Sequence, residues 1–299
     1  MRRPQNIISL LMVGVLLALP SGILAQMNWA QIGTPATIGI RPHTMDAADG
    51  IIVVGGNGLA ITTNNGATWR NITPNISANP NFVGIAIYDR NIFAVQSGVS
   101  GIYITSDQGM SWRPLLYSSP VVTAFPLIFM NDPQKILCTI DLGFLYTSDG
   151  GNTFTTTTTS LNPYQFKHAA DGTVRLFSRT DSEVITASSS DTGKTWVAST
   201  VLPYHDCFSI IADPFNPNVH CLINEDFYLQ QYQCMIFRTS DNGGTWDTTF
   251  SHSLTYLAGS SDRGCTDYFV GTVSDGILRS TDQGLSWHGI GGPSGAPDF

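Results

Sequence analysis

The stretch TSDQGMSW at residues 105–112 recurs five more times with small changes. In every copy an Asp or Asn is followed two residues later by Gly and five residues later by Trp or Phe. The other copies are TTNNGATW (62–69), TSDGGNTF (147–154), SSDTGKTW (189–196), TSDNGGTW (239–246) and STDQGLSW (280–287). Successive aromatic residues are separated by 43, 42, 42, 50 and 41 residues. A fixed period of this length is typical of stacked copies of one unit, and a four-stranded propeller blade fits it best.

Each residue type in the motif suits a tight turn between two strands. The carboxylate or amide can accept from nearby backbone N–H groups and close an Asx-type turn. The glycine supplies a positive φ, and we expect the aromatic ring to bury its face between sheets. We therefore predict a structural role for all eighteen residues: Asn64, Gly66, Trp69, Asp107, Gly109, Trp112, Asp149, Gly151, Phe154, Asp191, Gly193, Trp196, Asp241, Gly243, Trp246, Asp282, Gly284 and Trp287.

Short apolar runs precede every motif. Runs such as Gly101–Ile104 and Gly143–Tyr146 are apolar on consecutive residues and do not alternate, as expected for strands packed on both faces. Two earlier runs in each repeat are separated by turn signals such as Asp171-Gly172. The pattern predicts three strands before each motif and one after it, which is an all-β fold.

The motif resembles the Asp-box, or bacterial neuraminidase repeat, of the form Ser/Thr-x-Asp-x-Gly-x-Thr/Ser-Trp. Only Asn64 and Phe154 depart from the form at the acid and the aromatic positions, and the resemblance covers residues 28–290. It implies a β-propeller with the motifs on its periphery, between the third and fourth strands of each blade. The short, regular loops are most similar to the propellers of the photosystem II assembly factor family and the sortilin type, which bind proteins and do not catalyse.

The number of repeats predicts the number of blades. Six full repeats account for residues 40–290, and NWAQIG at 28–33 resembles SWHGIG at 286–291. Either the ring has six blades and the extra strand reinforces the seam, or a seventh blade is incomplete. The period favours six blades in a single domain over residues 26–291, followed by a short flexible tail at 292–299.

Residues 1–25 have the pattern of a secretory signal peptide. Arg2 and Arg3 precede an apolar run at 7–19, and small residues lead to Ala25. The alternative is a membrane anchor, but the run of 13 residues falls short of the roughly 20 that a spanning helix needs. We expect a secreted or periplasmic protein without stable membrane insertion.

Charge and cysteine content limit the partners of the exported chain. Cleavage after Ala25 would remove two of the 14 basic side chains and none of the 22 acidic ones, which leaves a net charge of −10. We therefore expect no nucleic-acid partner, because nucleic-acid binding needs clustered cations. The five cysteines can form one or two bridges or remain buried thiols, and the sequence leaves both possibilities open.

Propeller topology predicts a ligand face opposite the motifs. That face carries the second-to-third strand loops and the connections between blades. The 50-residue fifth repeat has its surplus at 224–233, and tyrosines recur in the connections. The alternatives are an extended hairpin that covers a seam and rings that fill the wedge between blades. The predicted binding residues for a protein or glycan ligand are Tyr117, Tyr164, Tyr204, Glu225, Asp226, Tyr228, Tyr232 and Tyr256.

The sequence contains no convincing catalytic set. Sialidases carry a Phe/Tyr-Arg-Ile-Pro motif, and Ile40-Arg41-Pro42 matches it only in part. Xyloglucanase-like propellers pair two aspartates across a cleft. The acids on the predicted ligand side that could form such a pair are Asp141, Asp181, Asp226 and Asp275. The histidines do not align within the repeat, so we expect no metal and no cofactor. The sequence favours a non-enzymatic binding scaffold, with a glycoside hydrolase as the alternative.

Overall fold

The computed structural model describes most of the repeat region. The described ranges are 38–48, 50–76, 80–97, 101–117, 128–132, 134–140, 143–158, 163–168, 171–179, 184–202, 207–213, 215–226, 233–252, 256–261, 267–272 and 276–290. The predicted signal peptide, the NWAQIG strand and the C-terminal tail lie outside these ranges. Within them, no helix is long and apolar enough to cross a membrane.

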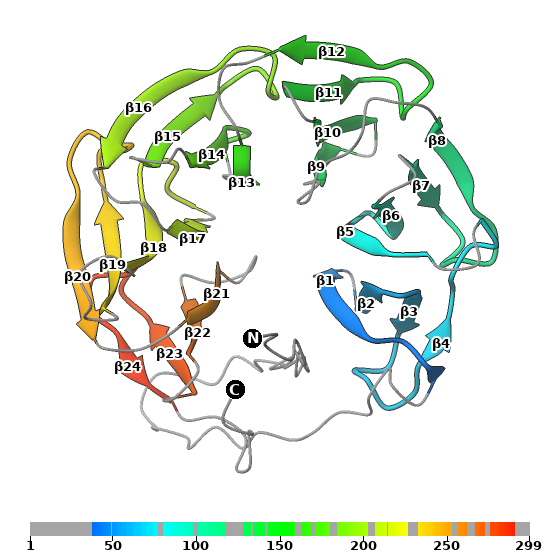
Figure 1. Cartoon of the computed structure of the whole chain (residues 1–299), viewed down its shortest axis with the longest axis horizontal. Helices are drawn as coiled ribbons and strands as arrows, with labels where there is room; N and C mark the ends of the chain where they lie inside the picture. Colours follow the sequence, from blue (N-terminus) through cyan, green and yellow to red (C-terminus); the bar gives the residue numbers. More distant parts are fainter. Residues whose placement is uncertain are drawn as a thin grey trace, which may run out of the picture. The chain divides into compact units, whose positions relative to one another are not determined.

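The described residues form six four-stranded antiparallel sheets, each made of four consecutive strands in sequence order (Figure 1). They divide into two compact units, and the boundary falls inside β12. The first unit contains three sheets. They consist of β1 (Pro42–Ala48), β2 (Ile51–Gly56), β3 (Leu59–Thr62) and β4 (Arg70–Asn71); β5 (Phe82–Tyr88), β6 (Asn91–Gln96), β7 (Gly101–Thr105) and β8 (Arg113–Tyr117); and β9 (Ile128–Asp132), β10 (Lys135–Ile140), β11 (Gly143–Thr147) and β12 (Thr155–Thr158).

The second unit contains the fourth, fifth and sixth sheets. They consist of β13 (Pro163–His168), β14 (Val174–Arg179), β15 (Val184–Ser189) and β16 (Val197–Leu202); β17 (Cys207–Ala212), β18 (His220–Asp226), β19 (Gln233–Thr239) and β20 (Asp247–His252); and β21 (Tyr256–Ser261), β22 (Tyr268–Thr272), β23 (Ile277–Ser280) and β24 (His288–Gly289). Every motif lies between the third and fourth strands of its sheet, as predicted.

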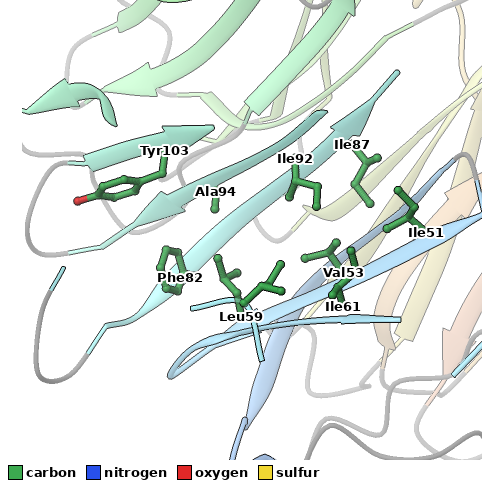
Figure 2. Packing of buried hydrophobic residues seen from close by; sticks show 10 residues of the cluster. Ile51, Val53, Leu59, Ile61, Phe82, Ile87, Ile92, Ala94 and Tyr103 are labelled. Carbon is green, nitrogen blue, oxygen red and sulfur yellow. The ribbon is translucent and has the colours of Figure 1, made fainter. Parts of the chain in front are cut away.

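The middle strands are buried because neighbouring sheets of the same unit pack against each other. Within the first unit β5 contacts both β1 and β9, and within the second unit β17 contacts both β13 and β21. Figure 2 shows the apolar cluster between the first and second sheets, in which Val53 and Leu59 meet Phe82 and Ile92. On β6, Ala94 belongs to this cluster, whereas the next residue, Val95, packs on the opposite face with Cys138 and Leu145 of the third sheet. The consecutive apolar runs therefore serve two interfaces at once.

Strand order places each motif turn beside the first-to-second strand turn of the same sheet. In the third sheet the Gly150 N–H donates to the carbonyl of Gln134 at 3.0 Å, and in the fifth the Asn242 N–H donates to that of Asn218 at 3.0 Å. We call the end of each sheet, along the strand direction, that carries these two turns the motif edge. The other end, which carries the second-to-third strand connection, is the opposite edge.

Candidate functional site

The acid of each motif turn is hydrogen-bonded within its own turn. In the fifth copy, Oδ1 of Asp241 accepts from the Thr245 N–H and the Thr239 hydroxyl, both at 2.8 Å, and Oδ2 accepts from the Thr245 hydroxyl at 2.7 Å. The Thr239 hydroxyl in turn accepts from the Gly243 N–H at 2.8 Å. The same pattern recurs at the other four acids, Asp107, Asp149, Asp191 and Asp282.

The first copy of the motif keeps this geometry with an amide in place of the acid. Oδ1 of Asn64 accepts from the Thr68 N–H at 3.0 Å and from the Thr62 hydroxyl at 2.9 Å, while its Nδ2 donates to the Thr68 hydroxyl at 2.9 Å. The role of the leading Ser or Thr was not part of the prediction. Its signal is the invariant hydroxyl two residues before the acid or amide in all six copies.

The motif carboxylates are held in their ionised form. The pKa of Asp241 is lowered to about 2, first by the Thr245 N–H and then by the hydroxyls of Thr245 and Thr239. The Ser111 hydroxyl is the main cause of the lowered pKa of Asp107. An acid that stays ionised is a poor general acid at neutral pH. In the described part of the chain, no group of three or more His, Cys, Asp or Glu residues could hold a metal ion.

All six motif glycines have positive φ, between 82° and 86°. Several of them also lie against the preceding sheet of the same unit. A Cβ built on Gly109 would come within 2.5 Å of Ile72, and one built on Gly284 within 2.5 Å of the Cys221 sulfur. Two separate constraints therefore require glycine at these positions: the positive φ of the backbone and the short distance to a side chain of the preceding sheet.

Arginines and tryptophans tie the motif turns to the neighbouring sheet. Arg70 Nη2 donates to the carbonyl of Gln108 at 2.6 Å, and Arg238 Nε donates to that of Gln283 at 2.8 Å. The Trp112 indole N–H donates back to the Ile72 carbonyl at 2.8 Å. We expected the motif rings to be buried, but only Trp287 is (8% exposed), and the other five are partly exposed. The rings lie at the motif edge, where one side of the ring meets solvent.

The predicted binding residues that the structure describes all lie at opposite edges. Tyr117 ends β8, Tyr164 lies near the start of β13, Tyr256 begins β21, and Glu225 and Asp226 end β18. Tyr117 belongs to the first unit and the other four belong to the second. Tyr204, Tyr228 and Tyr232 lie outside the described residues, as do Asp141, Asp181 and Asp275 of the alternative catalytic set.

The fifth sheet differs from the others at its opposite edge. Its β18–β19 hairpin pairs as far as Asp226 with Gln233, whereas β17 pairs with β18 only as far as Cys207 with Asn224. The structure describes the β19 partners of Glu225 and Asp226, and the residues that precede β17 lie outside the described ranges. The surplus of the 50-residue repeat thus lengthens the β18–β19 hairpin at the opposite edge, and this hairpin end is the candidate site.

Two hollows in the first unit lie at the motif edge instead. One is lined by Arg113, Gln134 and Gly150 among others, and the second by Ile76, Met110 and Trp112 among others. None of the predicted binding tyrosines lines either hollow. In the first hollow Arg113 donates to the Gly150 carbonyl at 3.0 Å, and in the second Trp112 donates to the Ile72 carbonyl at 2.8 Å, so both hollows belong to the contacts between sheets.

No family model and no curated protein matches the sequence. Solved structures do match. A GH74 enzyme of Niastella koreensis has a TM-score of 0.63 and 16% identity over 81% of this chain and 45% of its own. YCF48 bound to D1 peptide has a TM-score of 0.61 and 16% identity over 81% and 78%. A chain of a nidogen/laminin complex has a TM-score of 0.56 and 11% identity over 77% and 88%.

These similarities show the fold of the chain. The matching proteins are β-propellers, and this chain has the four-stranded antiparallel sheets of that fold. The chain spans less than half the length of the Niastella koreensis enzyme. Since that group of structures includes both enzymes and binding proteins, the fold is compatible with either function.

Proposed function

We propose that this chain is an exported, non-enzymatic β-propeller of six Asp-box blades that binds a protein or glycan ligand through the edge opposite its motifs. The main support is the bonding of the motif acids. Each carboxylate accepts several hydrogen bonds from its own turn, as Asp241 does from Thr245 and Thr239. The polar groups of the motif acids are therefore already bonded at the motif edge, and we assign ligand binding to the opposite edge.

The extended hairpin of the fifth sheet supports this assignment. It places two acidic residues, Glu225 and Asp226, at the end of β18 on the opposite edge. Two similar propeller structures contain a bound polypeptide by their own descriptions, YCF48 with D1 peptide and the nidogen/laminin complex. Both observations therefore support a propeller that binds a polypeptide at the lengthened hairpin of its fifth sheet.

Paired substitutions at the two edges test the proposal. We expect Glu225→Lys with Asp226→Lys to abolish binding on peptide and glycan arrays. The control is Met110→Lys, which adds a cation to a side chain that is 80% exposed in a motif turn. It should leave binding unchanged. Loss of binding in the control alone would assign the ligand to the motif edge and refute the proposal.

The alternative function is a glycoside hydrolase, and the similarity to the GH74 enzyme favours it. It would use two of Asp141, Asp181, Asp226 and Asp275 as acid and base, which requires a carboxyl separation of about 5–10 Å. Release of reducing sugar from xyloglucan by the wild-type protein, and its loss in Asp226→Asn or Asp275→Asn, would establish this activity. No release from any tested polysaccharide would leave the scaffold as the function.

Export and ring closure complete the proposal. Cleavage after Ala25 predicts a mature N-terminus at Gln26, which mass spectrometry of the exported protein and of its N-terminal peptide would identify. A closed ring of six blades predicts a compact, disc-like particle in small-angle scattering. An elongated particle would indicate that the two units do not close into one ring.

A further inference from the structure

Buried polar atoms without hydrogen-bond partners are concentrated in one sheet. Among the described residues, the five such atoms are Nδ1 of His220, Oδ1 and Nδ2 of Asn224, Oδ1 of Asn242 and Nε1 of Trp246. All of them belong to the fifth sheet or to its motif turn. A buried polar group without a partner is costly, and native proteins contain few of them. This sheet therefore holds several buried polar atoms for which the protein itself supplies no partner.

Three of these residues lie together at the motif edge. His220 begins β18, and Asn242 and Trp246 belong to the motif turn of the same sheet. The rings of His220 and Trp246 meet edge to face, with their centroids 5.1 Å apart. The Asn242 N–H donates at 3.0 Å to the carbonyl of Asn218, two residues before His220. The three residues are therefore neighbours, whereas Asn224 lies further along β18 toward the opposite edge.

The His220 and Trp246 side chains face the fourth sheet. Leu222, two residues after His220 and on the same side of the strand, packs in one cluster with residues of the fourth sheet and with Trp246. Arg175 of the fourth sheet reaches the same region, because its Nε and Nη2 donate to the Pro217 carbonyl at 3.1 and 2.5 Å. Both sheets belong to the second unit. The unpaired atoms therefore lie at the interface between the fourth and fifth sheets.

At two other interfaces the motif tryptophan bonds directly to the preceding sheet. Nε1 of Trp112 donates to the Ile72 carbonyl at 2.8 Å, and Nε1 of Trp287 donates to the Thr249 hydroxyl at 3.3 Å. Each acceptor follows the motif aromatic of its own repeat by three residues. Nε1 of Trp246 is covered in the same way and has no acceptor. Trp246 therefore lacks the bond that its two counterparts make.

His220 also differs from its register equivalents, which pair with the leading Ser or Thr of their motifs. The second sheet has Ile92 at this position, and the sixth has Tyr268, whose hydroxyl donates to Oδ2 of Asp213 at 2.6 Å. An isoleucine needs no partner, and the tyrosine has one in the preceding sheet. Nδ1 of His220 is buried without one. Two polar atoms that lack protein partners thus come together at this interface.

The chemistry of the unpaired atoms determines what can bind between them. The Trp246 indole can only donate, the Asn242 oxygen can only accept, and Nδ1 of a neutral His220 can accept. A metal cation cannot accept a bond from the indole N–H, and a simple anion cannot donate to the two acceptors. A water molecule accepts one bond and donates two, which matches this set. Buried waters in proteins typically make about three hydrogen bonds to polar groups that otherwise lack partners.

We propose that the interface between the fourth and fifth sheets contains a binding site for one water molecule, formed by Trp246, His220 and Asn242. The water accepts from Nε1 of Trp246 and donates to Nδ1 of His220 and to Oδ1 of Asn242. His220 is therefore the Nε2–H tautomer, whose Nδ1 lone pair is free to accept. The water replaces the direct acceptors that Trp112 and Trp287 have. This inference does not depend on the proposed function.

A high-resolution crystal structure of the protein tests the site directly. We expect one ordered water at about 2.7–3.2 Å from Nε1 of Trp246, Nδ1 of His220 and Oδ1 of Asn242. NMR of the 15N-labelled protein at neutral pH should show the proton of His220 on Nε2. Protein atoms bonded directly to Nε1 and Nδ1, no water density at the site, or a proton on Nδ1 would overturn the inference.

Magnetic relaxation dispersion of the solvent provides a second readout, because it counts long-lived internal waters in solution. Trp246→Phe removes the donor and should lower the count by one water. The matched control is Trp112→Phe, which should keep the wild-type count because the indole of Trp112 bonds directly to a carbonyl. Equal counts in the wild type and Trp246→Phe, or the same loss in Trp112→Phe, would refute the site. Cooperative thermal melts of each variant exclude unfolding as the cause.

Asn242→Gly tests the third partner of the water. Glycine suits this position because Gly150 occupies it in the third motif with a φ of 69°. The variant removes one of three bonds, so we expect the water to exchange about tenfold faster than in the wild type. An unchanged residence time would exclude Asn242 from the site and overturn the three-partner arrangement.

Discussion

Arg238 of the fifth sheet donates from Nε to the carbonyl of Gln283, 45 residues further along in the motif turn of the sixth sheet, at 2.8 Å. Gln283 precedes the motif glycine and has a φ of 59°. In the first unit, Arg70 bonds to Gln108, which holds the same position in its turn with the same φ. The left-handed conformation of this residue therefore presents a carbonyl to the preceding sheet, so that one turn joins two sheets.

Replacing a buried arginine in such a contact should lower the free energy of unfolding more than replacing an exposed one. Arg238 is 9% exposed, whereas Arg70 is exposed to solvent. We expect Arg238→Met to lower the free energy of unfolding by about 1–3 kcal/mol, because the Gln283 carbonyl loses a charged donor. Arg70→Met should cost only about 0.5 kcal/mol, since water can replace the guanidinium. Urea denaturation measures both, and equal losses would contradict the role of burial.

The motif glycines should be less replaceable than an equally left-handed glycine elsewhere. Gly284 has a φ of +82°, and a Cβ there would lie 2.5 Å from the Cys221 sulfur. Gly172 has a φ of +84°, and a Cβ there would meet nothing within 4 Å. Gly172→Ala should therefore cost about 1–2 kcal/mol for backbone strain alone. Gly284→Ala should cost clearly more, and similar Tm values for the two variants would exclude the packing contribution.

The all-β fold could be predicted because each residue of the motif has a local function. The positive φ of Gly109 and the carboxylate bonds of Asp107 follow from residue types that are close in the sequence. The bond from Arg113 to the Gly150 carbonyl could not be predicted. Its acceptor is a backbone atom 37 residues away, and nothing in the local pattern encodes that approach.

The candidate site could be predicted only in outline. The 50-residue interval identified the fifth repeat, and Glu225 and Asp226 do end a lengthened strand. The unpaired amide of Asn224 was not predicted, because it depends on strand register and on which neighbours approach. Residue spacing gives the position of Tyr117 or Tyr256 along a strand, but it does not determine what the side chain contacts.

The motif carboxylates should make the protein sensitive to acid. The pKa of Asp241 is about 2 in the folded protein, below its ordinary value of 3.8, chiefly because of the Thr245 N–H. The stability that this carboxylate contributes is present above about pH 4 and is lost as the pH falls toward 2. We expect Asp241→Asn to be less stable than the wild type at neutral pH. The difference should disappear near pH 2 in thermal melts, and a constant difference would show that the charge is irrelevant.

Buried thiols offer a direct probe of folding. Burial raises the pKa of Cys138 and of Cys221 to about 12, so neither thiol ionises near neutral pH. Because the thiolate is the reactive form, both cysteines should resist iodoacetamide in the folded protein and react once urea unfolds it. Mass spectrometry of labelled peptides measures this. Rapid labelling of Cys221 without denaturant would mean that the contact between the fifth and sixth sheets opens in the native state.

Protonation of His220 should lower the stability of the protein over a higher pH range than protonation of Asp241. It is 1% exposed, and its ring contacts Trp246 edge to face at a centroid distance of 5.1 Å. Burial is the main cause that lowers its pKa to about 3, and the positive charge of Arg175 adds to it, while Asp241 opposes it. The unfolded chain binds this proton below about pH 6.5 and the folded protein does not, so stability should fall as the pH drops from about 6.5 to about 3.

Isoleucine occupies the register position of His220 in other sheets, at Ile52, Ile92 and Ile136, which makes His220→Ile a well-matched replacement. The variant should remove the unpaired Nδ1 and gain stability at every pH. Its stability should also vary less between about pH 6.5 and 4.5 than that of the wild type. The Asp241→Asn protein should keep the wild-type slope in this window, because that carboxylate titrates only below about pH 4. Urea denaturation across the pH series measures both slopes, and an undiminished slope in His220→Ile would assign the proton uptake to another group.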